Sequence, residues 1–161
     1  MQLKTREKVL DLSVIIKLTS LGVALLAALL ISAGSARAEE SKMSSDTEAA
    51  IKRTIDTYIE GGRKGDSQIM RQAFHPDAII YGVHDGEAGG GAIQGLYDLV
   101  DGKPPAGDIP YTVTVLNQET DIAIVRLDIP DWAGTHYTDM FAMLKDGEDW
   151  KIITKLWHVH P

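Results

Sequence analysis

One acidic residue in the sequence lies among apolar and aromatic side chains. Asp139 alternates with Tyr137 and Phe141, so on a β-strand all three side chains point to the same face. If that face lines a pocket, loss of water would raise the pKa of the carboxyl group, which could then donate a hydrogen bond to a ligand oxygen. The alternative is a carboxylate that pairs with Lys155 or Arg126. The sequence leaves both interpretations open.

Two further residues could act together with Asp139. Tyr58 lies on the apolar stripe of a predicted helix, so its buried hydroxyl needs a partner, which could be a ligand, Asp139 or a backbone carbonyl. His84 begins a glycine-rich segment, where a neutral imidazole could move a proton, although many loop histidines are solvated and inert. If the domain is an enzyme, we expect Tyr58, Asp139 and His84 to be its catalytic residues.

Three histidines near the C-terminus could approach one another. His158 and His160 are two residues apart and would share one face of a strand, with His136 on the neighbouring strand. Two or three imidazoles joined by a carboxylate are sufficient for a zinc or copper site. No conventional ligand spacing is present, so we predict no metal, and these histidines remain the candidates for an alternative metal site.

Hydrophobic periodicity predicts three helices. The first follows the capping-box sequence Ser45–Glu48 and ends at Gly61–Gly62, which allow a left-handed cap. The second is capped by Asp66 and stops at His75–Pro76. The third covers Ile93–Val100, where apolar residues recur at helical spacing.

The remaining pattern predicts strands separated by turns. A first strand over Ala78–Val83 is followed by a glycine-rich loop, Asp85–Gly91. Four further strands are rich in β-branched and aromatic residues: Tyr111–Leu116, Ile122–Ile129, Tyr137–Leu144 and Trp150–Val159. The fold class is therefore α+β, with three N-terminal helices packed on a curved antiparallel sheet.

The N-terminus has the features of a signal peptide over residues 1–38. A basic start precedes an apolar run, Leu18–Ile31, and Ala36–Ala38 has the A-x-A pattern of a cleavage site. We expect export to the periplasm or secretion after cleavage near Ala38, with a retained membrane anchor as the alternative. Residues 39–45 are then a linker and residues 46–161 the folded domain.

The charge of the exported part restricts its partners. It carries 11 Lys and Arg against 21 Asp and Glu, a net charge of −10. Such a surface repels phosphate backbones and anionic lipids, so we expect no nucleic acid or membrane partner for the mature domain. The chain has no cysteine, which excludes disulfides and thiolate metal sites.

Several segments resemble one known superfamily: Phe74–Ala78, Ala92–Tyr97, Thr138–Phe141 and Asp149–Lys155. The chain is similar to nuclear-transport-factor-2-like (NTF2-like) proteins, and within them to the group named "putative lumazine-binding" or SnoaL-like. The resemblance implies a cone-shaped fold, a homodimer, no obligatory cofactor, and a pocket between the helices and the concave sheet that takes a pteridine-like or flat aromatic ligand. The superfamily includes isomerases, cyclases, dehydratases and simple binding proteins, so the fold alone does not select a function.

A comparison with ketosteroid isomerase, a member of this superfamily, concerns three positions. Tyr58 and Asp139 match the tyrosine and the protonated aspartic acid of its oxyanion hole, while Gly82 stands where its general base would be. Steroid isomerisation is therefore not expected.

We expect binding of a small, largely apolar or flat aromatic molecule. An isomerase, cyclase or dehydratase that stabilises an enolate with Tyr58 and Asp139 is the alternative. A metal-binding or protein-interaction module that uses the C-terminal histidines is the third possibility. The predicted ligand-binding residues are Tyr58, Tyr81, His84, Tyr97, Asp139 and Phe141.

Overall fold

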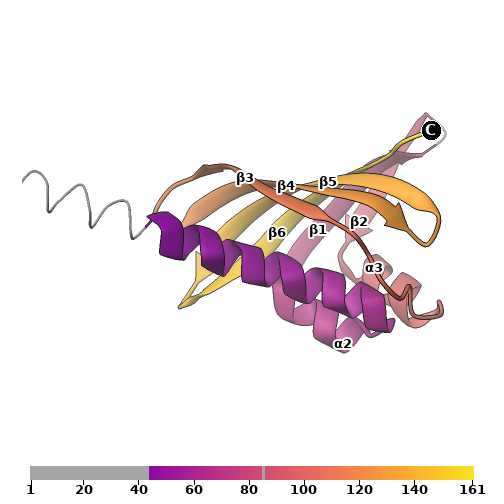
Figure 1. Ribbon diagram of the computed structural model, residues 1–161, viewed down its shortest axis with the longest axis horizontal. Coiled ribbons are helices and arrows are strands. Elements are labelled where there is room, and N and C mark those ends of the chain that lie inside the picture. The colour runs from indigo at the N-terminus through magenta and orange to yellow at the C-terminus, as the bar shows by residue number, and fades with distance from the viewer. Residues whose placement is uncertain (1–43, 85) are drawn as a thin grey trace, which may run out of the picture. The chain divides into compact units, whose positions relative to one another are not determined.

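A curved sheet of six strands forms one layer of the domain, and helices cover its concave side (Figure 1). The computed structural model describes residues 44–84 and 86–161, so the predicted signal peptide and most of the predicted linker lie outside the described residues. The described part already begins in a helix at residue 44. None of its helices is both long and apolar enough to cross a membrane.

The strands are arranged in the order β2-β1-β6-β5-β4-β3, with β1 and β6 parallel and every other neighbouring pair antiparallel. After β2 the chain crosses to the far edge and returns strand by strand, so β6 ends beside β1 and runs in the same direction. The α+β class is confirmed, but the prediction of a wholly antiparallel sheet was wrong for this one pair. The strands are β1 (Phe74–His84), β2 (Glu87–Ala92), β3 (Thr112–Gln118), β4 (Ile122–Trp132), β5 (Thr135–Asp146) and β6 (Asp149–Val159).

The segment predicted as a glycine-rich loop contains the edge strand β2. Its residues pair with β1 in regular antiparallel register, from Ile79 opposite Ala92 to His84 opposite Glu87. Three consecutive glycines give no alternation of apolar and polar side chains, so the sequence pattern carries no strand signal, yet their backbone groups can still form the ladder. Most of β2 is exposed, as is typical of an edge strand.

The first helix is described over residues 44–64 and ends later than predicted. Its left-handed cap is Gly65, with φ of 62°, and the next N–H, that of Asp66, donates to the carbonyl of Gly61 at 2.9 Å. This six-to-one hydrogen bond is the pattern of a Schellman motif. Gly61 and Gly62 are therefore helical residues rather than the end of the helix.

These two helical glycines allow close packing. A Cβ atom on Gly61 would lie 2.6 Å from Cβ of Met70, and one on Gly62 would lie 2.3 Å from the ring of Trp132. Real Cβ atoms do not approach so closely, so only glycine lets the helix sit against both neighbours.

The other helices are short. Asp66 caps α2 (Ser67–Met70) as predicted, because its carboxylate accepts from the N–H groups of Gln68 and Ile69. A 3₁₀ turn, η1 (Arg71–Ala73), follows, and Phe74 already belongs to β1, so the second helix is shorter than predicted. The third, α3, covers Gln94–Asp101, close to its predicted range.

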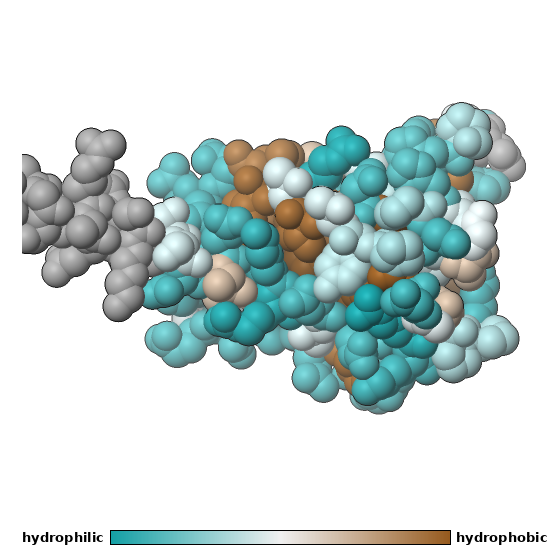
Figure 2. All heavy atoms as spheres, viewed as in Figure 1, coloured by the Kyte–Doolittle hydropathy of each residue, from teal (hydrophilic) through white to brown (hydrophobic). Residues whose placement is uncertain are grey.

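The core lies between the first helix and the concave face of the sheet. The predicted apolar stripe of the helix is confirmed, since none of its four side chains is more than 2% exposed. Figure 2 shows hydrophobic side chains between this helix and the sheet, surrounded by a mostly hydrophilic surface. The buried stripe is Ile51, Ile55, Tyr58 and Ile59, and the sheet opposes it with Val125, Leu127, Ile129, Phe141 and Met143.

Two glycine-to-alanine substitutions should have opposite effects on stability. Gly65→Ala places a side chain at positive φ and should destabilise the protein by roughly 1–2 kcal/mol. Gly95→Ala, in α3 with open space around its Cβ position, should stabilise it by up to about 1 kcal/mol. Urea unfolding of both variants measures the two changes in the free energy of unfolding. Equal effects would contradict the assignment of Gly65 as the helix cap.

Candidate ligand-binding site

A cavity of about 850 Å³ lies between the helices and the concave face of the sheet. Residues Gly89 to Ala92, together with Gly95, give part of its wall almost no side chains, and Leu96, Leu99 and Val100 of α3 give another part an aliphatic surface. The lining includes the indole rings of Trp132 and Trp157 and seven polar side chains: Tyr58, His84, Lys103, Thr135, Tyr137, Asp139 and Lys155. A mostly apolar wall with a few polar groups is the usual composition of a small-molecule site.

Three of these polar side chains form a buried network. The hydroxyl of Tyr58 donates to Oδ2 of Asp139 at 3.1 Å, and the ammonium of Lys155 forms an ion pair with Oδ1 of the same carboxylate. Tyr58, Asp139 and Lys155 are 2%, 1% and 4% exposed. Of the alternatives that the sequence leaves open, the structure therefore has Asp139 paired with Lys155, and Tyr58 bonded to Asp139. Arg126 instead contacts Asp128.

The network brings together three separate elements. Tyr58 comes from the first helix, Asp139 from β5 and Lys155 from β6. Strand pairing sets Phe141 opposite Lys155 and Asp139 opposite Trp157, so the carboxylate and the ammonium are diagonal neighbours on adjacent strands. Two alternating strand patterns and one helical stripe are thus enough to assemble it.

Burial changes the acidity of two groups in the network. Loss of water, reinforced by the Asp139 carboxylate and its hydrogen bond, raises the pKa of Tyr58 well above 10. Burial also lowers the pKa of Lys155, and Asp139 offsets this effect only in part. Tyr58 therefore remains a hydrogen-bond donor, while Lys155 holds its proton less tightly than a surface lysine does.

The rings around the network keep it dry. Tyr58 contacts Phe74, Trp132 and Phe141 with ring centroids 5.6 to 5.7 Å apart. The ammonium of Lys155 lies 5.7 Å from the centre of the Tyr58 ring and 5.9 Å from that of Phe141. These distances allow a cation–π attraction that helps to hold the charge inside.

The structure places three of the predicted site residues at the cavity and three elsewhere. Tyr58, His84 and Asp139 line it. Tyr81 does not, because it points to the outer face of the sheet and is 46% exposed. Tyr97 packs against Phe74 and beneath the guanidinium of Arg71, and Phe141 lies in the core beside Tyr58.

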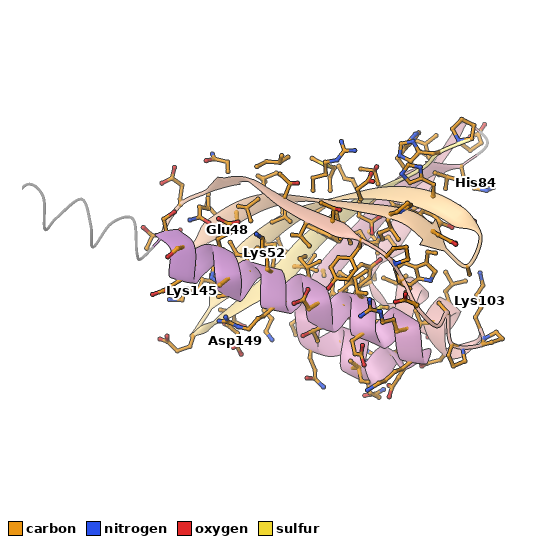
Figure 3. The ribbon with its side chains drawn as sticks, viewed as in Figure 1. Glu48, Lys52, His84, Lys103, Lys145 and Asp149 are labelled. Carbon is orange, nitrogen blue, oxygen red and sulfur yellow. The ribbon has the colours of Figure 1, made fainter. Side chains whose placement is uncertain are left out.

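A structural reason accounts for the glycine at the position of the missing general base. A Cβ atom on Gly82 would lie 2.2 Å from the indole of Trp157, so that ring occupies the space of a side chain. His84 lies nearby, its ring centroid 6.5 Å from that of Trp157. Figure 3 shows His84 and Lys103, another lining residue, at the end of the domain where the first helix ends.

Lys155 lines the cavity, although the sequence indicated this lysine only as a possible partner of Asp139. Alternation along β6 does place Lys155, Trp157 and Val159 on one face, and this signal could have been used. Trp132 and Trp157 were also not predicted as lining residues, because large aromatic side chains in a small domain are usually core, whereas alternation already placed Tyr137 on the face of Asp139.

The ion pair predicts a double-mutant cycle with strong coupling. Asp139→Asn or Lys155→Met alone leaves a buried charge without its partner and should cost about 3–5 kcal/mol of stability. The double variant should lose much less than the sum of the two, because no unpaired charge remains. Unfolding by urea gives all four free energies. Additive losses would show that the two charges do not interact.

Comparisons with known proteins agree with this fold. A family model described as "Putative lumazine-binding" matches residues 46–158. The aldolase FrzH of Cladobotryum sp. is 36% identical over 119 residues, covering 73% of this chain and 94% of that protein.

Solved structures show the same architecture. An NTF2-like protein from Shewanella baltica is 36% identical, with a TM-score of 0.69 over 73% of this chain and 96% of its own. A ketosteroid isomerase-like protein from Erwinia carotovora atroseptica is 17% identical, with a TM-score of 0.56 over 70% of this chain and 95% of its own, and supports the fold alone. The chain therefore belongs to the "Putative lumazine-binding" family of the NTF2-like superfamily.

Proposed function

We propose that the domain binds a small, largely apolar or flat aromatic molecule in the cavity, with a polar group of the ligand facing Lys155 and Asp139. The observation that carries this proposal is the buried network of Tyr58, Asp139 and Lys155 at the wall of a cavity of about 850 Å³. Buried charges are costly to maintain for stability alone. Their place at a mostly apolar cavity fits recognition of a polar group.

The wall of the cavity favours a flat ligand. The glycines of β2 present backbone rather than side chains, and two indole rings are available for stacking. The family description supports a pteridine-like ring system. Such rings carry carbonyl oxygens that can accept from Lys155 and N–H groups that can donate to Asp139.

An enzyme that acts on a carbonyl compound is the second candidate, favoured by Lys155 and by the related aldolase. The hydroxyl of Tyr58 already donates a hydrogen bond to Asp139. In this arrangement the group that can donate a hydrogen bond to an enolate oxygen is therefore the Lys155 ammonium.

Lys155 could also act covalently. Once it transfers its proton to Asp139, the neutral amine can add to a carbonyl carbon to give a carbinolamine, and the proton held by Asp139 lets the hydroxyl group leave as water, which gives an iminium ion. A role for His84 in moving the proton next to the carbonyl stays a prediction.

Export and dimerisation complete the proposal. The basic, apolar and small-residue pattern of residues 1–38 supports export to the periplasm or secretion. A homodimer is supported by apolar side chains on the outer face of β1 and β6, which are 43–52% exposed. Apolar side chains grouped in this way on a surface are typical of a protein interface. These side chains are Ile79, Tyr81, Val83 and Leu156.

Lumazine is a suitable probe of the binding proposal. It should bind the wild-type protein and raise its melting temperature, and Lys155→Met should weaken this binding at least tenfold, because the ligand loses its charged partner. Lys145→Met is the matched control, since Lys145 lies far from Lys103 and His84 (Figure 3) and does not line the cavity. Equal affinity in both variants would contradict a role for Lys155 in binding.

Reductive trapping tests the covalent route. With acetone and cyanoborohydride, Lys155 should be alkylated faster than exposed lysines such as Lys145, because burial lowers its pKa and leaves more neutral amine. Peptide mapping by mass spectrometry measures the extent at each lysine. If Lys155 reacts more slowly than Lys145 in a folded protein, iminium formation at this site is excluded.

A further inference from the structure

A second cluster of polar side chains lies on the outer face of the sheet, beside the C-terminus marked in Figure 1. It contains Asp128 of β4, His136 and Thr138 of β5, and His160 just beyond β6. These strands are neighbours, and the N–H of His160 donates to the carbonyl of His136 at 3.0 Å. Backbone pairing therefore fixes the positions from which the side chains extend. None of them lines the cavity described above.

The side chains of the cluster already contact one another. Nε2 of His136 lies 3.4 Å from Oδ1 of Asp128. The hydroxyl of Thr138 donates to the same oxygen at 3.1 Å and lies 2.8 Å from Nε2 of His160. One ligand atom from each of Asp128, His136 and His160 falls within 4.8 Å of the other two.

We propose that Asp128, His136 and His160 bind a divalent transition-metal ion of the Zn²⁺ class. Two imidazole nitrogens and one carboxylate oxygen form a ligand set that such ions prefer, and a fourth position stays open to water or a ligand. Thr138 is a positioning residue for Asp128, because its hydroxyl donates to the carboxylate.

A small rearrangement is needed to close the site. Zinc ligands at 2.0–2.1 Å in a tetrahedron lie about 3.3 Å from one another, close to the distance between His136 and Asp128. The rings of His136 and His160 are stacked, with centroids 3.8 Å and planes 18° apart, so their nitrogens do not converge on one point. Rotation of the His160 ring about its side-chain bonds supplies the missing convergence and leaves the backbone in place.

The protonation states suit metal binding. Partial burial and the neighbouring His136 and His158 lower the pKa of His160, which favours the neutral ring that binds metals. Although burial raises the pKa of Asp128, hydrogen bonds from Thr138, His136 and Arg126 lower it below its ordinary value. The carboxylate is thus ionised at neutral pH.

Arg126 opposes the metal. Its guanidinium lies 3.3 Å from Oδ1 of Asp128 and brings a positive charge next to the proposed ion. A carboxylate has two oxygens, so it can coordinate the metal ion while it accepts a hydrogen bond from Arg126. Arg126 therefore weakens the site rather than blocking it. This gives the proposal an unusual signature: Arg126→Gln should strengthen metal binding.

Isothermal titration of the untagged, chelator-treated protein with Zn²⁺ tests the proposal. We expect one site per chain, an affinity lowered at least tenfold by His136→Ala and by His160→Ala, and an affinity raised severalfold by Arg126→Gln. His75→Gln is the matched control, because this partly exposed imidazole lies outside the cluster, with its Nδ1 accepting from the N–H of Asp77. Circular dichroism establishes that each variant is folded.

Nuclear magnetic resonance of the wild-type protein keeps the test independent of variant folding. On addition of Zn²⁺, the ring nitrogens of His136 and His160 should shift before those of His75. No binding by the wild-type protein, or Zn²⁺ affinity unchanged in a folded His136→Ala/His160→Ala variant, would overturn the proposal. None of these readouts depends on the function of the cavity.

Discussion

The ion pair between Lys155 and Asp139 is the interaction on which the interior of this domain depends. Two opposite charges on side chains no more than 5% exposed persist only because each neutralises the other and because Tyr58 supplies a further hydrogen bond. Aromatic rings surround them and exclude water. Packing in the rest of the domain offsets the free energy that is needed to remove these charges from water. Such an arrangement is more easily understood as a site than as a device for stability.

The fold is organised to bring these three groups together. The first helix supplies Tyr58 only because Gly61 and Gly62 let it approach Met70 and Trp132 closely. The hairpin of β5 and β6 supplies both charges. The glycines of β2, together with Ala92 and Gly95, leave the cavity open beside them. Each feature is local, but the cavity results from all of them.

The sequence predicted the fold well because the fold depends on periodic signals. The helical stripe around Tyr58 and the alternation around Asp139 were strong, and both patterns appear in the structure. Signals without side-chain periodicity failed: the glycines of β2 pair as a strand, and the end of the first helix lies at Gly65. Register was also hard to predict, because β5 and β6 shift by a bulge between Ala142 and Met143. The sequence therefore offered Lys155 or Arg126 as one possible partner of Asp139 but did not place that partner at the cavity.

A crystal structure of the protein purified from its own host tests the central claim most directly. The account predicts density for a small molecule in the cavity, within hydrogen-bond distance of Lys155 or Asp139. The contradictory result is a cavity filled by the protein's own side chains, with Lys155, Asp139 and Tyr58 turned toward solvent.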